Sequence, residues 1–260
     1  APDFRGHRSA ALARFRFALG AVVGRYKWTR NNPATPDGTS RLSPWMHFGV
    51  LSPREIARAV GAAEEAGDLH PAARWKFLDE TLTWREYYYH RCRHDAAFTR
   101  YAGLPTWARQ TLAAHADDPR DSLPLDVLLH GETDDAVWNA AQKQFLLDGW
   151  MHNNLRMYWV KQILPWCATP ERAFATACYL NDRLSLDGRD AATYGGIRWG
   201  FGDSKRAYRE TAVYGWVPRK TSAALMKRTG FRAWAREAAA RPAFRVALPD
   251  DEAAALARYC

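Results

Sequence analysis

Apolar residues recur at helical spacing along most of this 260-residue chain, and this pattern limits its fold more than any other feature. The clearest stretches are residues 9–25, 73–92, 105–116 and 134–164, the last of them ending at Pro165. No stretch alternates apolar and polar side chains as a half-buried strand does. No apolar run approaches the roughly 18 residues that a membrane-spanning helix requires. The sequence therefore predicts an all-α protein with a single domain over residues 1–260 and no contact with a membrane.

Local signals mark several helix ends. Ser52-Pro53-Arg54-Glu55 has the form of a capping box with proline at the first helical position, and it predicts a helix that ends near Gly67. Thr169-Pro170-Glu171 predicts another helix, which reaches about Asp182. Residues 184–202 are rich in glycine and predict a loop that lines a pocket, and shorter helices are expected at residues 222–229 and 251–259.

Charge and cysteine content narrow the class of protein. The 37 Lys and Arg exceed the 28 Asp and Glu, which gives a net charge of +9. Such an excess suits a polyanionic partner such as nucleic acid, although a basic surface that only aids solubility has the same composition. The four cysteines form no CxxC pair or regular framework and are interpreted as reduced thiols of a cytoplasmic protein.

Common catalytic motifs are absent. The chain has no GxGxxG, no GxxxxGK[ST], no HExxH and no GxSxG, which argues against a Rossmann site, a P-loop, a zinc protease and a serine hydrolase. His90 and His94 lie one helical turn apart, but arginines flank them and no carboxylate converges on them. A solvated basic face explains this pair better than a metal site.

A turn rich in hydroxyl groups precedes one predicted helix. Gly38-Thr39-Ser40-Arg41-Leu42-Ser43-Pro44 combines amide N–H groups at a helix start with hydroxyls and a guanidinium. Such a combination can hold a diphosphate. A plain helix cap accounts for the same residues, so both interpretations stay open at this point.

The same turn resembles the signature of the photolyase/cryptochrome flavoproteins. The resemblance continues through Trp45-Met46-His47-Phe48-Gly49 and Trp84-Arg85-Glu86-Tyr87-Tyr88-Tyr89-His90. Trp138-Asn139-Ala140-Ala141-Gln142, Met157-Tyr158-Trp159, Tyr179-Leu180-Asn181-Asp182-Arg183 and Leu186-Asp187-Gly188-Arg189-Asp190 are similar to class II photolyases, whereas Gly149-Trp150-Met151-His152-Asn153 is closer to class I.

The resemblance implies the helical FAD-binding domain of this family, without the α/β antenna domain that precedes it in other members. It implies light-driven repair of cyclobutane pyrimidine dimers by electron transfer from reduced FAD, UV-damaged DNA as the partner and a monomer. The alternative is a cryptochrome-like photoreceptor that binds FAD and repairs nothing.

The resemblance also assigns cofactor-binding residues. Those expected to hold the diphosphate and ribityl chain or to line the flavin cavity are Tyr26, Thr39, Ser40, Arg41, Leu42, Ser43, Arg85, Asn153, Arg156, Asp182 and Asp187. Asn181 is expected to face the flavin N5 atom. Without the resemblance, a helix C-terminus, where Asn and a cation are common, explains Asn181-Asp182-Arg183 better than a flavin contact does.

A pocket for the dimer is implied as well. Glu80 would bind the carbonyl edge of the pyrimidine pair, while Trp84, Met157 and Trp199 would form flat apolar walls. Enzymes of this kind extrude the damaged base from the duplex. Without the resemblance, core packing explains the aromatic residues and a surface carboxylate explains Glu80.

Three tryptophans, Trp138, Trp159 and Trp166, resemble the electron relay of class II photolyases. Trp159 and Trp166 are seven residues apart, which places them on roughly one helical face. Ile197 stands where the class I relay begins with a tryptophan, so that route is expected to be broken. Aromatic core packing remains the alternative for each ring.

Basic residues are frequent in the last third, and Arg198, Arg219, Lys220 and Arg228 are expected to contact DNA. Phosphate contacts of this type position a duplex without selecting its sequence. The chain departs from the family pattern at Asn154, Thr193 and the segment Asp203-Ser204-Lys205-Arg206. These departures concern the choice of substrate more than the binding of flavin.

Overall fold

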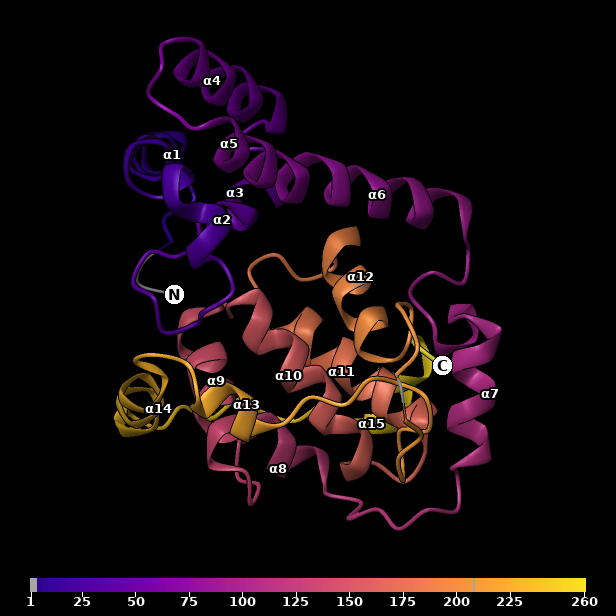
Figure 1. Cartoon of the computed structure of the whole chain (residues 1–260). Helices are drawn as coiled ribbons and strands as arrows, with labels where there is room; N and C mark the ends of the chain where they lie inside the picture. Colours follow the sequence, from indigo (N-terminus) through magenta and orange to yellow (C-terminus); the bar gives the residue numbers. More distant parts are fainter. Residues whose placement is uncertain (1–3, 208) are drawn as a thin grey trace.

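The computed structural model describes residues 4–207 and 209–260, and these residues are helical apart from loops and one isolated bridge between Thr211 and Gly215. The prediction of an all-α fold is confirmed (Figure 1). The first half of the chain contains α1 (Arg8–Ala21), η1 (Val23–Arg25), α2 (Tyr26–Thr29), α3 (Ser43–His47), α4 (Pro53–Glu65), α5 (Pro71–Leu78), η2 (Asp79–Thr83), α6 (Trp84–His94), η3 (Tyr101–Gly103), α7 (Thr106–Ala114) and α8 (Leu125–His130). The second half contains α9 (Ala136–Asp148), α10 (Asn153–Ile163), η4 (Leu164–Trp166), α11 (Pro170–Leu184), α12 (Ala191–Gly200), α13 (Ser222–Met226), α14 (Phe231–Ala240) and α15 (Glu252–Ala257).

The predicted helix starts have the expected chemistry. The Ser52 hydroxyl accepts from the Arg54 N–H with Pro53 in the first turn of α4. Thr169 caps α11 in the same way by accepting from the Arg172 N–H, again with a proline following the cap. Each cap satisfies an amide group that has no partner inside the helix, which fixes where the helix begins.

The single helix predicted over residues 134–164 is wrong, because two helices occupy this stretch. Gly149 ends α9 in the left-handed region with φ of 62°. The chain then turns, and the His152 ring accepts from the Asn154 N–H to start α10. The turn is held from outside the stretch by the Leu186 N–H, which donates to the Gly149 carbonyl. Apolar periodicity continues through the turn, so it did not reveal the break.

The loop predicted over residues 184–202 is also wrong, since most of it forms α12. Its glycines allow close packing instead of flexibility. A Cβ atom at Gly195 would lie 2.4 Å from the Tyr88 ring of α6, and one at Gly200 would lie 2.3 Å from Val160 of α10. Helix α12 therefore packs tightly between α6 and α10 (Figure 1). Helix α14, which the sequence patterns did not predict, follows Gly230 at a φ of 77°.

The buried side chains form two separate clusters. The smaller one, which we call the N-terminal core, joins α1, α3, α4 and α5 through residues such as Phe15, Trp45, Ile56 and Phe77. The larger one, the main core, is built around α9 to α12. Figure 1 shows the N-terminal helices α1–α5 as a group beside the rest of the chain. The elements that carry most of the predicted site residues meet where these two cores face each other.

Of the helices in the described part of the chain, none combines the length and apolar character that a bilayer crossing demands.

Candidate functional site

The hydroxyl-rich turn before α3 forms a concave arrangement of backbone amides. Arg41 has a φ of 56°, a left-handed conformation that is unusual for a residue other than glycine, and Leu42 returns to the right-handed region. Alternation of this kind turns successive N–H groups to one side and creates an anion-binding nest. Within the described residues, the N–H groups of Thr39, Ser40 and Leu42 donate to no protein acceptor. The turn therefore offers free donors of the type that a diphosphate requires.

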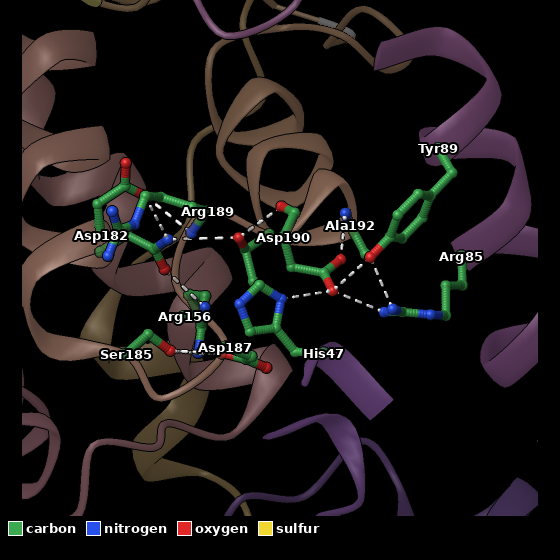
Figure 2. A network of polar contacts seen from close by, with 12 residues as sticks. His47, Arg85, Tyr89, Arg156, Asp182, Ser185, Asp187, Arg189, Asp190 and Ala192 are labelled. Carbon is green, nitrogen blue, oxygen red and sulfur yellow. Dashed lines mark hydrogen bonds and ion pairs between the residues drawn. The ribbon is translucent and has the colours of Figure 1, made fainter. Parts of the chain in front are cut away.

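A buried arginine links this turn to the segment after α11. Arg156 of α10 donates 2.7 Å to the Asn181 side-chain oxygen, and its other terminal nitrogen lies 3.7 Å from Asp187 (Figure 2). Burial alone would raise the pKa of Asp187. The charge of Arg156 and hydrogen bonds from the Ser185 and Ser43 hydroxyls outweigh it, so the pKa lies below its usual value. Asp187 is thus held as a carboxylate between α3 and α10.

Asp190 joins three elements at one carboxylate. Its Oδ2 atom accepts from Arg85 at 2.8 Å and from the Tyr89 hydroxyl at 3.0 Å, and His47 Nδ1 lies 3.2 Å away (Figure 2). Its Oδ1 atom caps α12 by accepting from the Ala192 N–H. This carboxylate therefore holds α3, α6 and the start of α12 together across the space between the two cores.

Asp182, which is expected to line the flavin cavity, has both carboxylate oxygens bound by groups of the protein. Its Oδ2 atom accepts from the hydroxyls of Tyr194 at 2.6 Å and Tyr259 at 2.7 Å. Its Oδ1 atom accepts from the Arg189 N–H. With both oxygens used by the protein, Asp182 fastens α12 and the C-terminal α15 region to α11. Asn181 beside it is fully buried, and its amide nitrogen lies 3.4 Å from the Thr193 hydroxyl.

Glu80 lies in an unusual helical turn. Residues Asp79–Thr83 form the π-helical segment η2 between α5 and α6. A π turn contains one extra residue per turn and is frequent at functional sites. The Glu80 carboxylate contacts the Arg30 guanidinium, and it lies 2.7 Å from Lys76 Nζ. In this structure both partners of Glu80 are cations, so they compete with any ligand for it.

Two of the predicted pocket walls lie together. The Trp84 and Trp199 rings are 6.3 Å apart and nearly perpendicular, and both are more than a third exposed. Large rings of this type are normally buried, so their exposure marks a surface available for a partner.

The other predicted residues near this surface differ in burial. Met157 is half-buried on α10, while Asn153 is exposed at the first position of the same helix. Tyr26 packs edge-on against Phe77, with the Arg30 guanidinium 5.7 Å from its ring.

The three relay tryptophans form a connected series, in an order that differs from their order in the chain. The Trp138 and Trp159 rings are parallel within 3°, with centroids 5.9 Å apart. Trp166 stands edge-on to Trp138 at 5.2 Å. Trp138 therefore lies between Trp159 and Trp166. Ile197, at the position of the class I relay, is fully buried.

The four predicted DNA contacts differ in exposure. Arg219 is exposed and Arg228 is half-buried. Lys220 donates 2.8 Å to the Asn154 carbonyl, and burial together with the charge of Arg228 lowers its pKa to about 8. The prediction for Arg198 is wrong, because its side chain is fully buried and binds Asp203 and the carbonyls of Phe98 and Gly103.

Replacing Arg198 by methionine is expected to lower the free energy of unfolding by about 3 kcal/mol, because the Phe98 and Gly103 carbonyls would lose their buried donor while Asp203 keeps Arg91 as a partner. Denaturant unfolding of the purified variant measures this loss. The exposed Arg219→Met variant is the matched control and should unfold near the wild-type midpoint. Equal midpoints for the two variants would contradict the structural role of Arg198.

Sequence reasoning missed His47, Tyr89, Asp190 and Gln142 as parts of the site. Asp190 could have been found from its position as an N-cap before a helical stretch, had residues 191–200 been recognised as helical. His47, Tyr89 and Gln142 lie in segments that resemble the family, but no local pattern indicates their partners, because only the packing of distant helices brings these together.

Comparison with known proteins places this arrangement in a family. No protein-family model matches the chain. A deoxyribodipyrimidine photo-lyase of Methanothermobacter thermautotrophicus is 38% identical over 215 residues, which cover 82% of this chain and 46% of that protein. One of Potorous tridactylus is 39% identical over 188 residues, covering 72% of this chain and 35% of that protein.

Solved structures show the same fold. The crystal structure of a bacterial class III photolyase from Agrobacterium tumefaciens has a TM-score of 0.63 at 20% identity, over 76% of this chain and 39% of that one. A cryptochrome of Synechocystis gives 0.61 at 21% identity, over 89% and 46%. The chain therefore has the fold of the matching part of these photolyase and cryptochrome structures. The chain belongs to the photolyase/cryptochrome family. It spans about half the length of the curated relatives that it matches, or less.

Proposed function

We propose that this chain binds FAD between its two cores and repairs cyclobutane pyrimidine dimers in DNA under light. The observation that carries the proposal is the amide nest at Arg41 and Leu42, followed by Ser43, whose hydroxyl bonds to Asp187 of the Arg156–Asp187 pair, because this contact brings diphosphate donors near buried charges of both signs. Thr39, Ser40 and Ser43 would hold the diphosphate. Arg156, Asn181 and Arg85 would surround the ring system.

Reduced FAD, when bound and illuminated, supplies the single electron that opens the dimer and takes it back afterwards. The residues of the chain bind, orient and exclude water. Asn181 is fixed by Arg156 and Thr193 from opposite sides, so its amide has one orientation. The buried Arg156 supplies a positive charge that would stabilise an anionic cofactor in a water-poor site.

The dimer would enter between Trp84 and Trp199, the exposed perpendicular rings. Glu80 lies one turn before Trp84 and would bind the carbonyl edge of the pyrimidines once Arg30 turns toward a phosphate.

The positive charge around the proposed site favours DNA as the partner. Burial lowers the pKa of His152 to about 3, and the nearby charges of Lys220, Arg41 and Arg30 lower it in the same direction. A site with that many cations attracts a polyanion.

The test is anaerobic illumination of the FAD-reconstituted, chemically reduced chain with an oligonucleotide that contains thymine dimers. Restored thymine absorbance is the expected result, with a dark sample as control. If the chain binds FAD and the absorbance does not recover, the repair function is wrong and a photoreceptor function takes its place. A chain that takes up no FAD would overturn the cofactor proposal itself.

Replacing Glu80 by alanine is expected to lower the repair rate at least tenfold while FAD stays bound, because the dimer loses its polar contact and a lost charge-assisted bond costs about 1.5–3 kcal/mol. Glu86→Ala, on the exposed side of α6, is the matched control. The repair rates of both variants measure the contribution of Glu80, and their flavin absorbance shows whether FAD stays bound. A repair rate for Glu80→Ala equal to that of the control would remove Glu80 from the pocket.

A further inference from the structure

Gln142 makes an unusual pair of contacts beside the tryptophan series. It is fully buried on α9, and its side-chain oxygen accepts from the Trp159 indole N–H at 2.8 Å. Its amide nitrogen donates to the Leu129 carbonyl at 2.7 Å, which fixes the orientation of the amide. The Trp138 indole N–H donates to the Trp159 backbone carbonyl at 2.9 Å. Both buried indoles thus donate to amide oxygens.

The acceptor type matters once an indole loses an electron. An oxidised indole is a far stronger acid than the neutral ring, so its N–H proton leaves if a base accepts it. An amide oxygen accepts a hydrogen bond but is not a useful base at neutral pH. Loss of the proton would trap the oxidised state on that ring. If the ring keeps its proton, it can instead take an electron from the next tryptophan, and the oxidised state passes to that residue.

The titratable groups on the neighbouring elements are engaged elsewhere. Arg156 of α10 bonds to Asn181, and Asp135 at the start of α9 bonds to the Tyr158 hydroxyl. His130 of α8 contacts the carbonyls of Asp126 and Val246. Among the described residues, none of these groups contacts the Trp159 indole nitrogen. Gln142 is therefore its acceptor, and this acceptor is not basic.

We propose that Gln142 is a positioning residue that keeps the indole proton on Trp159, so that only electrons cross the buried part of the series. The proposal rests on the proposed FAD site. Trp159 gives one electron to photoexcited oxidised FAD, Trp138 refills Trp159, and Trp166 refills Trp138. The proton is released to water only at Trp166, which lies nearer the surface, and a thiol in solution then returns an electron and a proton to that ring.

The test compares Gln142→Glu and Gln142→His with Gln144→Glu, a matched change two residues along α9. Flash absorption of the FAD-loaded chain between pH 6 and 9 separates the cationic indole radical from the neutral one. In wild type and in Gln144→Glu, the first radical should be cationic at every pH, with no slowing in D₂O.

Gln142→His offers a base and should produce the neutral radical early, with a several-fold lower yield of oxidised Trp166. Gln142→Glu should behave as wild type at low pH, since burial raises the pKa of a carboxyl group. It should change to the neutral radical as pH rises through that pKa. The Raman band of the indole N–H confirms that each variant keeps the hydrogen bond.

An early neutral radical in the wild type, or a cationic one at every pH in both Gln142 variants, would overturn the proposal. Either result would leave flavin binding and photoreduction intact, so it is distinct from failure of the proposed function. That failure would appear before the flash as a chain without flavin absorbance, or after it as the absence of any tryptophan radical, and the role of Gln142 would be rejected with it.

Discussion

The Asp190→Ala variant should lose about 3–5 kcal/mol of unfolding free energy, the largest effect expected of any single change at the site. The reason is that Arg85 would remain buried without its counter-charge, and removal of one partner from a buried pair costs that much. Tyr89 and His47 would lose their shared acceptor at the same time. Denaturant titration gives the difference, and flavin retention after gel filtration should fall with it.

Asp251→Ala is the matched control, because Asp251 is also an N-cap but has no ion-pair partner in the described structure. Its loss should cost about 1 kcal/mol, the usual value of a cap. The difference between the two variants isolates the contribution of the Arg85–Asp190 pair from that of the cap on α12. Equal costs for both variants would show that the pair adds nothing to stability.

Trp138→Phe should abolish photoreduction of the oxidised, FAD-loaded chain, since phenylalanine is much harder to oxidise than tryptophan and Trp138 lies between the other two rings. Repair by chemically reduced chain should persist, because the series is needed only for reduction. Illumination with a thiol, followed by the loss of flavin absorbance, measures the first effect, and the repair assay measures the second.

Trp234→Phe, on α14, serves as the control for general loss of aromatic packing. It should photoreduce at the wild-type rate. Photoreduction at full rate in Trp138→Phe would mean that electrons reach the flavin by another route.

The helical class and most helix starts could be predicted from the sequence, because caps such as Ser52 and Thr169 act through neighbouring residues. The helix over residues 191–200 could not. Its glycines resemble loop residues until Tyr88 and Val160, which are distant in the chain, are known to need the space. The break at Gly149 was missed for a similar reason, since apolar residues on both sides continue the same periodicity.

Site residues in one local motif were found more readily than those that act across the fold. The turn at residues 39–43 was singled out by its hydroxyl-rich composition, which left a plain helix cap open, and only the family resemblance assigned it to the cofactor. Arg198 was misassigned because charge alone cannot distinguish an exposed arginine from one that binds two carbonyls inside the protein. The tyrosine partners of Asp182 were not foreseen either, since they come from α12 and the C-terminus.

The separation of the apolar interior into two cores has a consequence for handling the protein. Residues 4–78, which hold the N-terminal core, are joined to the remainder through polar contacts such as His47 with Asp190 and Asn32 with the Thr229 carbonyl. A molecule bound at this junction stabilises the folded form by mass action, about 2.7 kcal/mol at a hundredfold excess over its dissociation constant. Preparations that lose their flavin during storage should therefore be cut by proteases first within residues 4–78. Added flavin should restore their resistance to proteolysis.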